Sequence, residues 1–189
     1  MTTPPSSLRL TGATVLRDGA LQQRSVAFED GRISKGPLPE VDLSGYLVLP
    51  GIVDLHGSAF ERHLAPRPGD AIPLDTALRA TDLDAAANGV TTGWISQAWS
   101  WEGGNRAPDR AEALLRALDA YSRRALTDLR VQIRCETHTA DTQDRLLAAV
   151  RRHRVDLVLF ANTLDEAGLL AEVDPVRLAQ WASQAGRTP

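Results

Sequence analysis

Residues 49–56, Leu-Pro-Gly-Ile-Val-Asp-Leu-His, decide the fold, because the spacing of apolar residues along the chain changes there. Before this stretch, short apolar runs alternate with turn signals. One of these signals is Asp30-Gly31, a dipeptide typical of tight hairpin turns in which both residues adopt positive φ. Residues 1–50 therefore predict a small antiparallel β unit, too small to be stable alone.

After this stretch, apolar strands and amphipathic helices follow one another four times. Strands are predicted at residues 52–55, 90–95, 129–135 and 155–160, and helices at 73–88, 108–124, 141–153, 164–170 and 175–185. Such a series predicts an α/β fold with a parallel sheet. The run at residues 155–160 is continuously apolar, which is typical of a strand buried on both faces.

Length and composition exclude several classes of protein. The 189 residues are 43% hydrophobic and can fill a core, but a closed (β/α)8 barrel typically needs about 250 residues. No apolar run reaches the ~18 residues of a membrane span, and the first residues lack the order of a signal peptide. With Cys135 as the only cysteine, we expect a reducing, cytoplasmic location and no membrane association.

The charge of the chain is nearly balanced, with a formal net charge of -3, and gives no reason to expect nucleic acid as a partner. Lys35 is the only lysine, so nearly every positive side chain is an arginine. Arginine binds phosphate and carboxylate groups through two parallel hydrogen bonds, which favours an anionic ligand over a neutral one.

Candidate reactive residues follow from position, because reactive groups of parallel α/β folds lie at the carboxyl ends of strands. His56 ends the first predicted strand, while Glu136 and His138 follow the third and share the parity of Arg134. Imidazole and carboxylate groups at neighbouring strand ends are suited to a divalent metal. A histidine that caps a strand and a loop glutamate paired with Arg134 would explain the same residues, and both interpretations stay open.

Two segments are candidates for binding an anion. Arg62 and Arg67 lie in one proline-containing loop, where guanidinium groups would suit phosphate. Residues 99–104 place two tryptophans and two glycines before the helix that begins near Pro108, and free amides at such an end suit phosphate. A solvated basic loop and tryptophans packed on the sheet are the simpler explanations of these segments.

Together with residues 49–56, the segments 56–62, 65–69, 97–104 and 134–138 resemble the metal-dependent amidohydrolase superfamily. Within it, they resemble the α-D-ribose 1-methylphosphonate 5-triphosphate diphosphatases of the carbon–phosphorus lyase pathway. The resemblance runs from about Leu8 to at least Glu166. It implies a small β-sandwich unit at residues 1–50, followed at residues 51–189 by the first half of a (β/α)8 barrel, about four strand–helix repeats.

The resemblance also implies a chemistry. It implies release of pyrophosphate from a phosphorylated ribose phosphonate, with a divalent metal such as Zn or Mn as cofactor. No catalytic acid, base or nucleophile is assigned. The predicted metal ligands are His56, Glu136 and His138, and the predicted substrate-binding residues are Arg62, Arg67 and Arg134.

The sequence departs from the pattern of that family after two of the strands. After the first strand the family usually carries His-x-Asp, whereas this chain has Ser58, and after the fourth strand Asn162-Thr163 stands where Asp-His is usual. We therefore expect weak metal affinity and negligible turnover from this chain alone. Two alternatives stay open: a non-catalytic interaction module that self-associates through an open barrel edge, and a metal-dependent hydrolase of cyclic amides.

Overall fold

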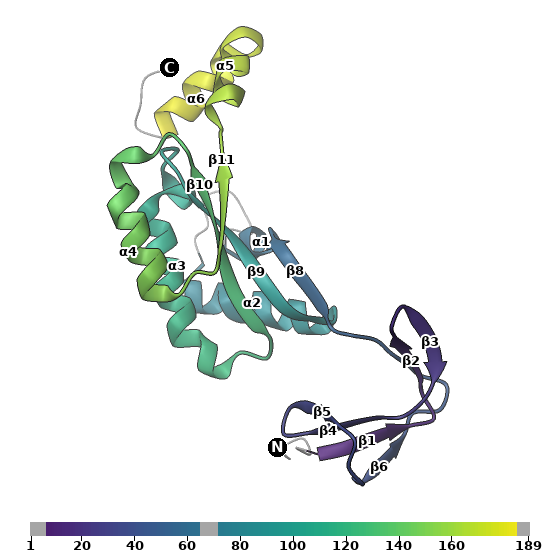
Figure 1. Ribbon diagram of the computed structural model, residues 1–189. Helices are drawn as coiled ribbons and strands as arrows, with labels where there is room; N and C mark the ends of the chain where they lie inside the picture. Colours follow the sequence, from purple (N-terminus) through teal and green to yellow (C-terminus); the bar gives the residue numbers. More distant parts are fainter. Residues whose placement is uncertain (1–6, 65–71, 185–189) are drawn as a thin grey trace. The chain divides into compact units, whose positions relative to one another are not determined.

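The computed structural model describes residues 7–64 and 72–184 (Figure 1). The chain divides into two compact units, Met1–Gly51 and Ile52–Pro189. The described residues form an α/β fold with a small, mainly antiparallel β region and a curled parallel sheet. Both features are consistent with a partial amidohydrolase-type fold.

The first unit consists of short strands in two sheets. Its pairings are antiparallel except for β1 with β6 and β2 with β7, which are parallel. One sheet has the order β5-β4-β1-β6 and the other β3-β2-β7. The strands are β1 Ser7–Thr11, β2 Thr14–Arg17, β3 Ala20–Gln23, β4 Val26–Glu29, β5 Arg32–Ser34, β6 Glu40–Asp42 and β7 Leu47–Val48.

Local turn chemistry explains this unit well. Asp30 and Gly31 have φ of 49° and 74°, so the predicted tight turn between β4 and β5 is confirmed. Gly12 allows a turn in the chain, because its φ of 71° is in the region that favours glycine. A side chain would also not fit, since a Cβ there would lie 2.3 Å from Ser44 Oγ. For that reason β1 and β2 are separate strands and pair in different sheets.

The second unit is built around four parallel strands in sequential order, β8-β9-β10-β11. The strands are β8 Ile52–Gly57, β9 Val90–Trp99, β10 Asp128–Glu136 and β11 Leu157–Ala161. The helices between and after them are α1 Phe60–Leu64, α2 Leu74–Ala87, α3 Pro108–Tyr121, α4 Gln143–His153, α5 Leu164–Val173 and α6 Pro175–Gln184, with short 3-10 turns η1 Gly104–Arg106, η2 Ser122–Arg124 and η3 Ala140–Thr142. The predicted strand–helix repeats are thus confirmed, within a few residues at each end.

The core of this unit lies between the sheet and its helices. Alternate residues of β9 and β10, such as Ile95, Trp99 and Ile133, are buried against α2 and α3. Figure 1 shows α3 and α4 running along one side of the sheet. Because successive side chains of a strand point to opposite faces, Ser96, Ala98 and the polar residues of β10 belong to the other face, called the inner face below.

The prediction that residues 155–160 are buried on both faces was wrong. β11 pairs only with β10 and is an edge strand, so Phe160 is 72% exposed and Leu159 is 41% exposed. β8 is the opposite edge, where Val53 and Leu55 are each 57% exposed. Apolar composition predicted strands here correctly, but it could not tell whether a neighbour covers them.

None of the helices in the described ranges is long and apolar enough to cross a membrane.

Candidate functional site

The inner face of β10 carries a row of polar residues toward its carboxyl end. Gln132, Arg134 and Glu136 alternate with the core residues Ile133 and Cys135, which face the helices. Gln132 and Glu136 are buried, and buried polar groups need hydrogen-bond partners within the protein. Each of them is therefore held by a specific partner.

His56 and Gln132 are the first such pair. The irregular register of β8 after Asp54 brings His56 Nδ1 to 2.7 Å from Gln132 Oε1, across the intervening strand β9. Gln132 Nε2 donates to the carbonyl of Leu55 at 3.0 Å, which fixes the amide so that Oε1 faces the imidazole. Because Oε1 can only accept, a neutral His56 carries its proton on Nδ1 and leaves the lone pair of Nε2 free.

The tautomer of His56 gives a direct test of this pair. Replacing Gln132 with leucine should remove the preference for a proton on Nδ1, since no acceptor would then face that nitrogen. Nitrogen NMR of the neutral imidazoles would show the change, with the His56 signal identified by its absence in His56→Gln. The control Gln143→Leu, at an exposed position of α4, should leave the His56 signal unchanged. An unchanged tautomer in Gln132→Leu would contradict the assigned pairing.

Glu136 is the second buried polar residue, and its carboxylate faces the loop after β11. Its Oε2 accepts hydrogen bonds from the backbone N–H of Thr163 at 2.7 Å and from the Thr163 hydroxyl at 2.6 Å. Thr163 immediately precedes α5, so this contact joins the end of β10 to the start of that helix. Thr163, one of the residues that differ from the family pattern, thus donates a hydrogen bond to the carboxylate that was predicted to bind metal.

The remaining predicted residues lie elsewhere. His138 is exposed in the turn after β10. Arg62 lies on α1 and forms an ion pair with Asp84 of α2, where hydrogen bonds from Arg62 and His63 hold the pKa of the Asp84 carboxyl below its ordinary value. Arg67 lies outside the described residues.

The three predicted metal ligands do not meet. In the ranges 7–64 and 72–184, no group of three or more His, Cys, Asp or Glu side chains is placed to hold a metal ion. No hydrogen bond to His56 Nε2 is found among the described residues, whereas the Glu136 carboxylate is bound to Thr163. The donor set of the described residues therefore does not fit a divalent metal as it stands.

Arg134 differs from Arg130, the other arginine on the strands of the parallel sheet. No ion pair to its guanidinium is found in the described part of the chain, and its Nε is buried without a hydrogen-bond partner there. Arg130, on the same strand and face, instead binds Asp128 and Asp156 and stacks on Trp94. A buried N–H donor without a partner is costly, and among the described residues Arg110 Nε is in the same situation.

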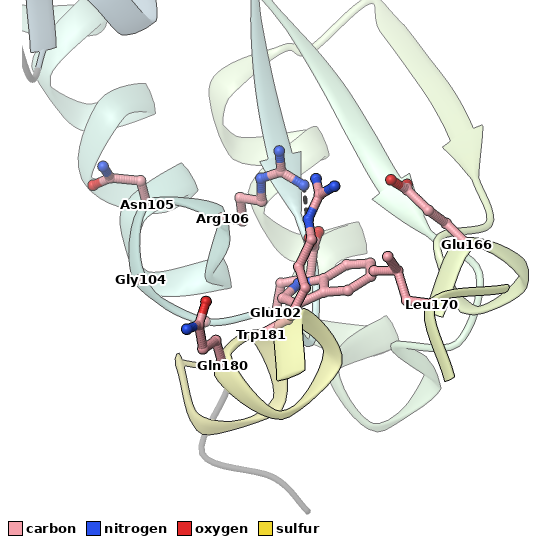
Figure 2. Close-up of a pocket in the computed structure, with 10 residues that line it drawn as sticks. Glu102, Gly104, Asn105, Arg106, Glu166, Leu170, Gln180 and Trp181 are labelled. Carbon is pink, nitrogen blue, oxygen red and sulfur yellow. Dashed lines mark hydrogen bonds and ion pairs between the residues drawn. The ribbon is translucent and has the colours of Figure 1, made fainter. Parts of the chain in front are cut away.

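A pocket lies beyond the carboxyl end of β9, and only one of its walls was predicted from the sequence. Its volume is about 670 Å³, and it is bordered by the loop at residues 102–106 and by helices α5 and α6 (Figure 2). The glycines and tryptophans at residues 99–104 had pointed to this loop. The opposite wall is formed by Glu166, Leu170, Arg177, Gln180 and Trp181, which had given no functional signal.

Glu102 organises the floor of this pocket. Only 6% of the residue is exposed, and its carboxylate accepts hydrogen bonds from Ser100 Oγ at 3.0 Å, Arg106 Nη1 at 2.6 Å and Trp181 Nε1 at 3.0 Å. The Trp181 ring also contacts Trp101, with 5.6 Å between the ring centroids. Glu102 therefore joins the loop after β9 to α6.

Comparison with known proteins shows a distant similarity to a hydrolase. No family model matches the chain. The chain is 29% identical over 144 residues to the protein named alpha-D-ribose 1-methylphosphonate 5-triphosphate diphosphatase from Escherichia coli (strain K12). The match covers 71% of this chain and 38% of the relative, so the chain spans well under half of the relative's length. This similarity supports a family-level resemblance to a hydrolase.

Proposed function

We propose that this chain provides a substrate-binding part of a hydrolase that releases pyrophosphate from ribose 1-methylphosphonate 5-triphosphate. The proposal rests on Arg134 of the inner face, whose Nε is buried with no hydrogen-bond partner among the described residues, and it is supported by the distant similarity to a diphosphatase of that name. A phosphate oxygen at Arg134 would give the buried Nε the acceptor it lacks.

In the proposed function, the inner face binds and orients the triphosphate. Arg134 donates to a phosphate oxygen, and His56 Nε2, held in place by the Gln132 contact at Nδ1, faces the same side of the sheet. Neither residue is assigned a proton transfer. Because His56, Glu136 and His138 do not form a metal-binding group, turnover by this chain alone is expected to be negligible.

The test measures binding and turnover separately. Isothermal titration with ribose 1-methylphosphonate 5-triphosphate should show saturable binding that Arg134→Gln weakens at least about tenfold, as expected for loss of a hydrogen bond between charged groups. The matched control is Arg130→Gln, because the charge of Arg130 is already neutralised by two carboxylates. Pyrophosphate release with added Zn or Mn is expected to stay near background.

Two results would contradict the proposal. If Arg134→Gln and Arg130→Gln bind the triphosphate equally well, then Arg134 does not contact it. Rapid pyrophosphate release that Glu136→Ala abolishes would show instead that Glu136 acts at the reacting centre, and that its bond to Thr163 is replaced when substrate binds.

A second candidate function is an interaction module that self-associates through an open barrel edge. It is favoured by the exposed apolar residues of both edge strands, Val53 and Leu55 on β8 and Phe160 on β11. Among the described residues β8 and β11 each have a neighbouring strand on one side only, so apolar surface is exposed at two edges of the same parallel sheet. This function and the first are compatible, because the edges and the inner face use different residues.

A further inference from the structure

We propose that the pocket between the loop at residues 102–106 and helices α5 and α6 binds a free α-amino acid with an apolar side chain. This inference goes beyond the proposed function, because it uses none of the inner-face residues and concerns a ligand of another chemical class. It rests on the balance of charges in the pocket, on which of these charges are already paired, and on the apolar surface that the pocket offers.

The charged side chains that line the pocket balance one another. Glu102 and Glu166 carry two negative charges. Arg106 and Arg177 carry two positive charges. A ligand with a net charge would leave one charge uncompensated in the pocket, whereas a ligand with one positive and one negative group keeps the balance. The pocket is therefore suited to a zwitterion.

One carboxylate and one guanidinium of this set are already bound to each other, and the other two are not. Glu102 Oε1 accepts a hydrogen bond from Arg106 Nη1 at 2.6 Å, and only 6% of Glu102 is exposed. Within residues 7–64 and 72–184, neither Glu166 nor Arg177 takes part in an ion pair or a side-chain hydrogen bond, although both line the same pocket. Arg177 can therefore bind a carboxylate through two parallel hydrogen bonds, and Glu166 can accept hydrogen bonds from an ammonium group.

The same pocket offers an apolar surface for the side chain of the amino acid. Trp181 and Leu170 line it, and the hydrogen bond from Trp181 Nε1 to Glu102 at 3.0 Å fixes the indole. Figure 2 shows Glu166 and Asn105 on opposite sides of Trp181. An apolar side chain would lose contact with water against this indole, and an aromatic ring would also stack on it. The volume of about 670 Å³ is typical of sites for small molecules.

The experiment titrates L-phenylalanine into the full chain and measures binding by calorimetry. Saturable binding is expected, and Arg177→Gln and Glu166→Gln should each weaken it at least about tenfold through loss of a charged hydrogen-bonding partner. The matched controls are Arg152→Gln on α4 and Glu172→Gln on α5. Both positions are exposed and lie outside the pocket, so these variants should bind L-phenylalanine like the parent chain.

Two analogues test the two charged groups of the ligand separately. 3-Phenylpropionate lacks the ammonium group and phenethylamine lacks the carboxylate, so each should bind at least about tenfold more weakly than L-phenylalanine. Glu166→Gln should not weaken the binding of 3-phenylpropionate further, because the group that Glu166 binds is already missing. For the same reason Arg177→Gln should not weaken the binding of phenethylamine further.

Three results would overturn the proposal. They are the absence of saturable L-phenylalanine binding, binding by Arg177→Gln or Glu166→Gln that equals that of the parent chain, and an analogue with one charge that binds as tightly as L-phenylalanine. The proposed function fails separately, because it is tested with the triphosphate and Arg134, and neither Arg177 nor Glu166 lies on the inner face.

Discussion

Replacing Asp82 with alanine is expected to lower the free energy of unfolding of the β/α unit by about 4 kcal/mol, because several buried hydrogen-bond donors would lose their acceptor. Asp82 of α2 is fully buried, and its carboxylate accepts four hydrogen bonds. The donors are Tyr121 Oη at 2.8 Å, the Leu126 amide at 2.7 Å, and the amide and hydroxyl of Thr127 at 3.0 and 2.6 Å. One side chain thus joins α2, the end of α3 and the entry to β10.

The same cluster predicts a pH dependence. Burial alone would raise the pKa of Asp82, but the hydrogen bonds from Leu126, Thr127 and Tyr121 outweigh it and hold the pKa below its ordinary value. A carboxyl whose pKa is lower in the folded state stabilises the fold above its unfolded pKa, near 3.9, and this stabilisation is lost as pH falls through the folded pKa. Parent and Asp82→Ala chains should therefore become more alike in stability at acid pH.

At alkaline pH the dependence of stability on pH has the opposite sign, because stability falls as the pH rises. Burial and the hydrogen bond to Asp82 raise the pKa of Tyr121 to about 12. A phenol that resists ionisation in the fold contributes stability that is complete below its unfolded pKa, near 10, and is lost as pH rises toward the folded value. We expect stability of the parent chain to decline from about pH 10 upward.

Urea unfolding followed by tryptophan fluorescence measures the free energy of unfolding of the second unit, because all four tryptophans lie after residue 51. The matched control is Asp141→Ala, which removes an exposed carboxylate and should change the free energy of unfolding by less than about 0.5 kcal/mol. A loss below about 1 kcal/mol in Asp82→Ala would show that the four hydrogen bonds do not stabilise the fold as described.

Glu136→Ala is expected to destabilise the same unit by about 3 kcal/mol and to loosen α5, whereas Glu136→Gln should lose only about 1 kcal/mol. Both bonds from Thr163 reach one oxygen of the carboxylate, and an amide oxygen can accept both. Alanine leaves the Thr163 amide without an acceptor, and only 2% of Glu136 is exposed to water that could replace it.

Hydrogen exchange separates the structural role of Glu136 from a metal-binding one. If the carboxylate fastens α5, amide protection at residues 163–173 should fall in Glu136→Ala and persist in Glu136→Gln, with or without added Zn or Mn. Asp165→Ala, at an exposed position in the first turn of the same helix, controls for general effects on α5. Metal-dependent protection that both Glu136 variants abolish would instead support the metal role.

The sequence predicted the strand–helix order of the second unit because that order depends on local spacing. Residues 108–124 show one apolar stripe, and α3 buries it through Leu114, Leu115 and Leu118. The tight turn at Asp30-Gly31 was equally local, since two adjacent residues with positive φ define it. The burial of residues 155–160 was mispredicted, because exposure depends on which strand lies beyond the edge of the sheet.

The candidate site divides in the same way. Position at strand ends was enough to single out His56, Arg134 and Glu136 from the sequence, since that position follows from the order of elements. Their partners were not visible: Gln132 lies 76 residues from His56, Thr163 lies 27 from Glu136, and Trp181 lies 79 from Glu102. Only the tertiary structure decides such pairs, because hydrogen bonds between distant segments depend on which strands and loops lie next to each other in the fold. The periodicity of apolar residues predicts only local secondary structure.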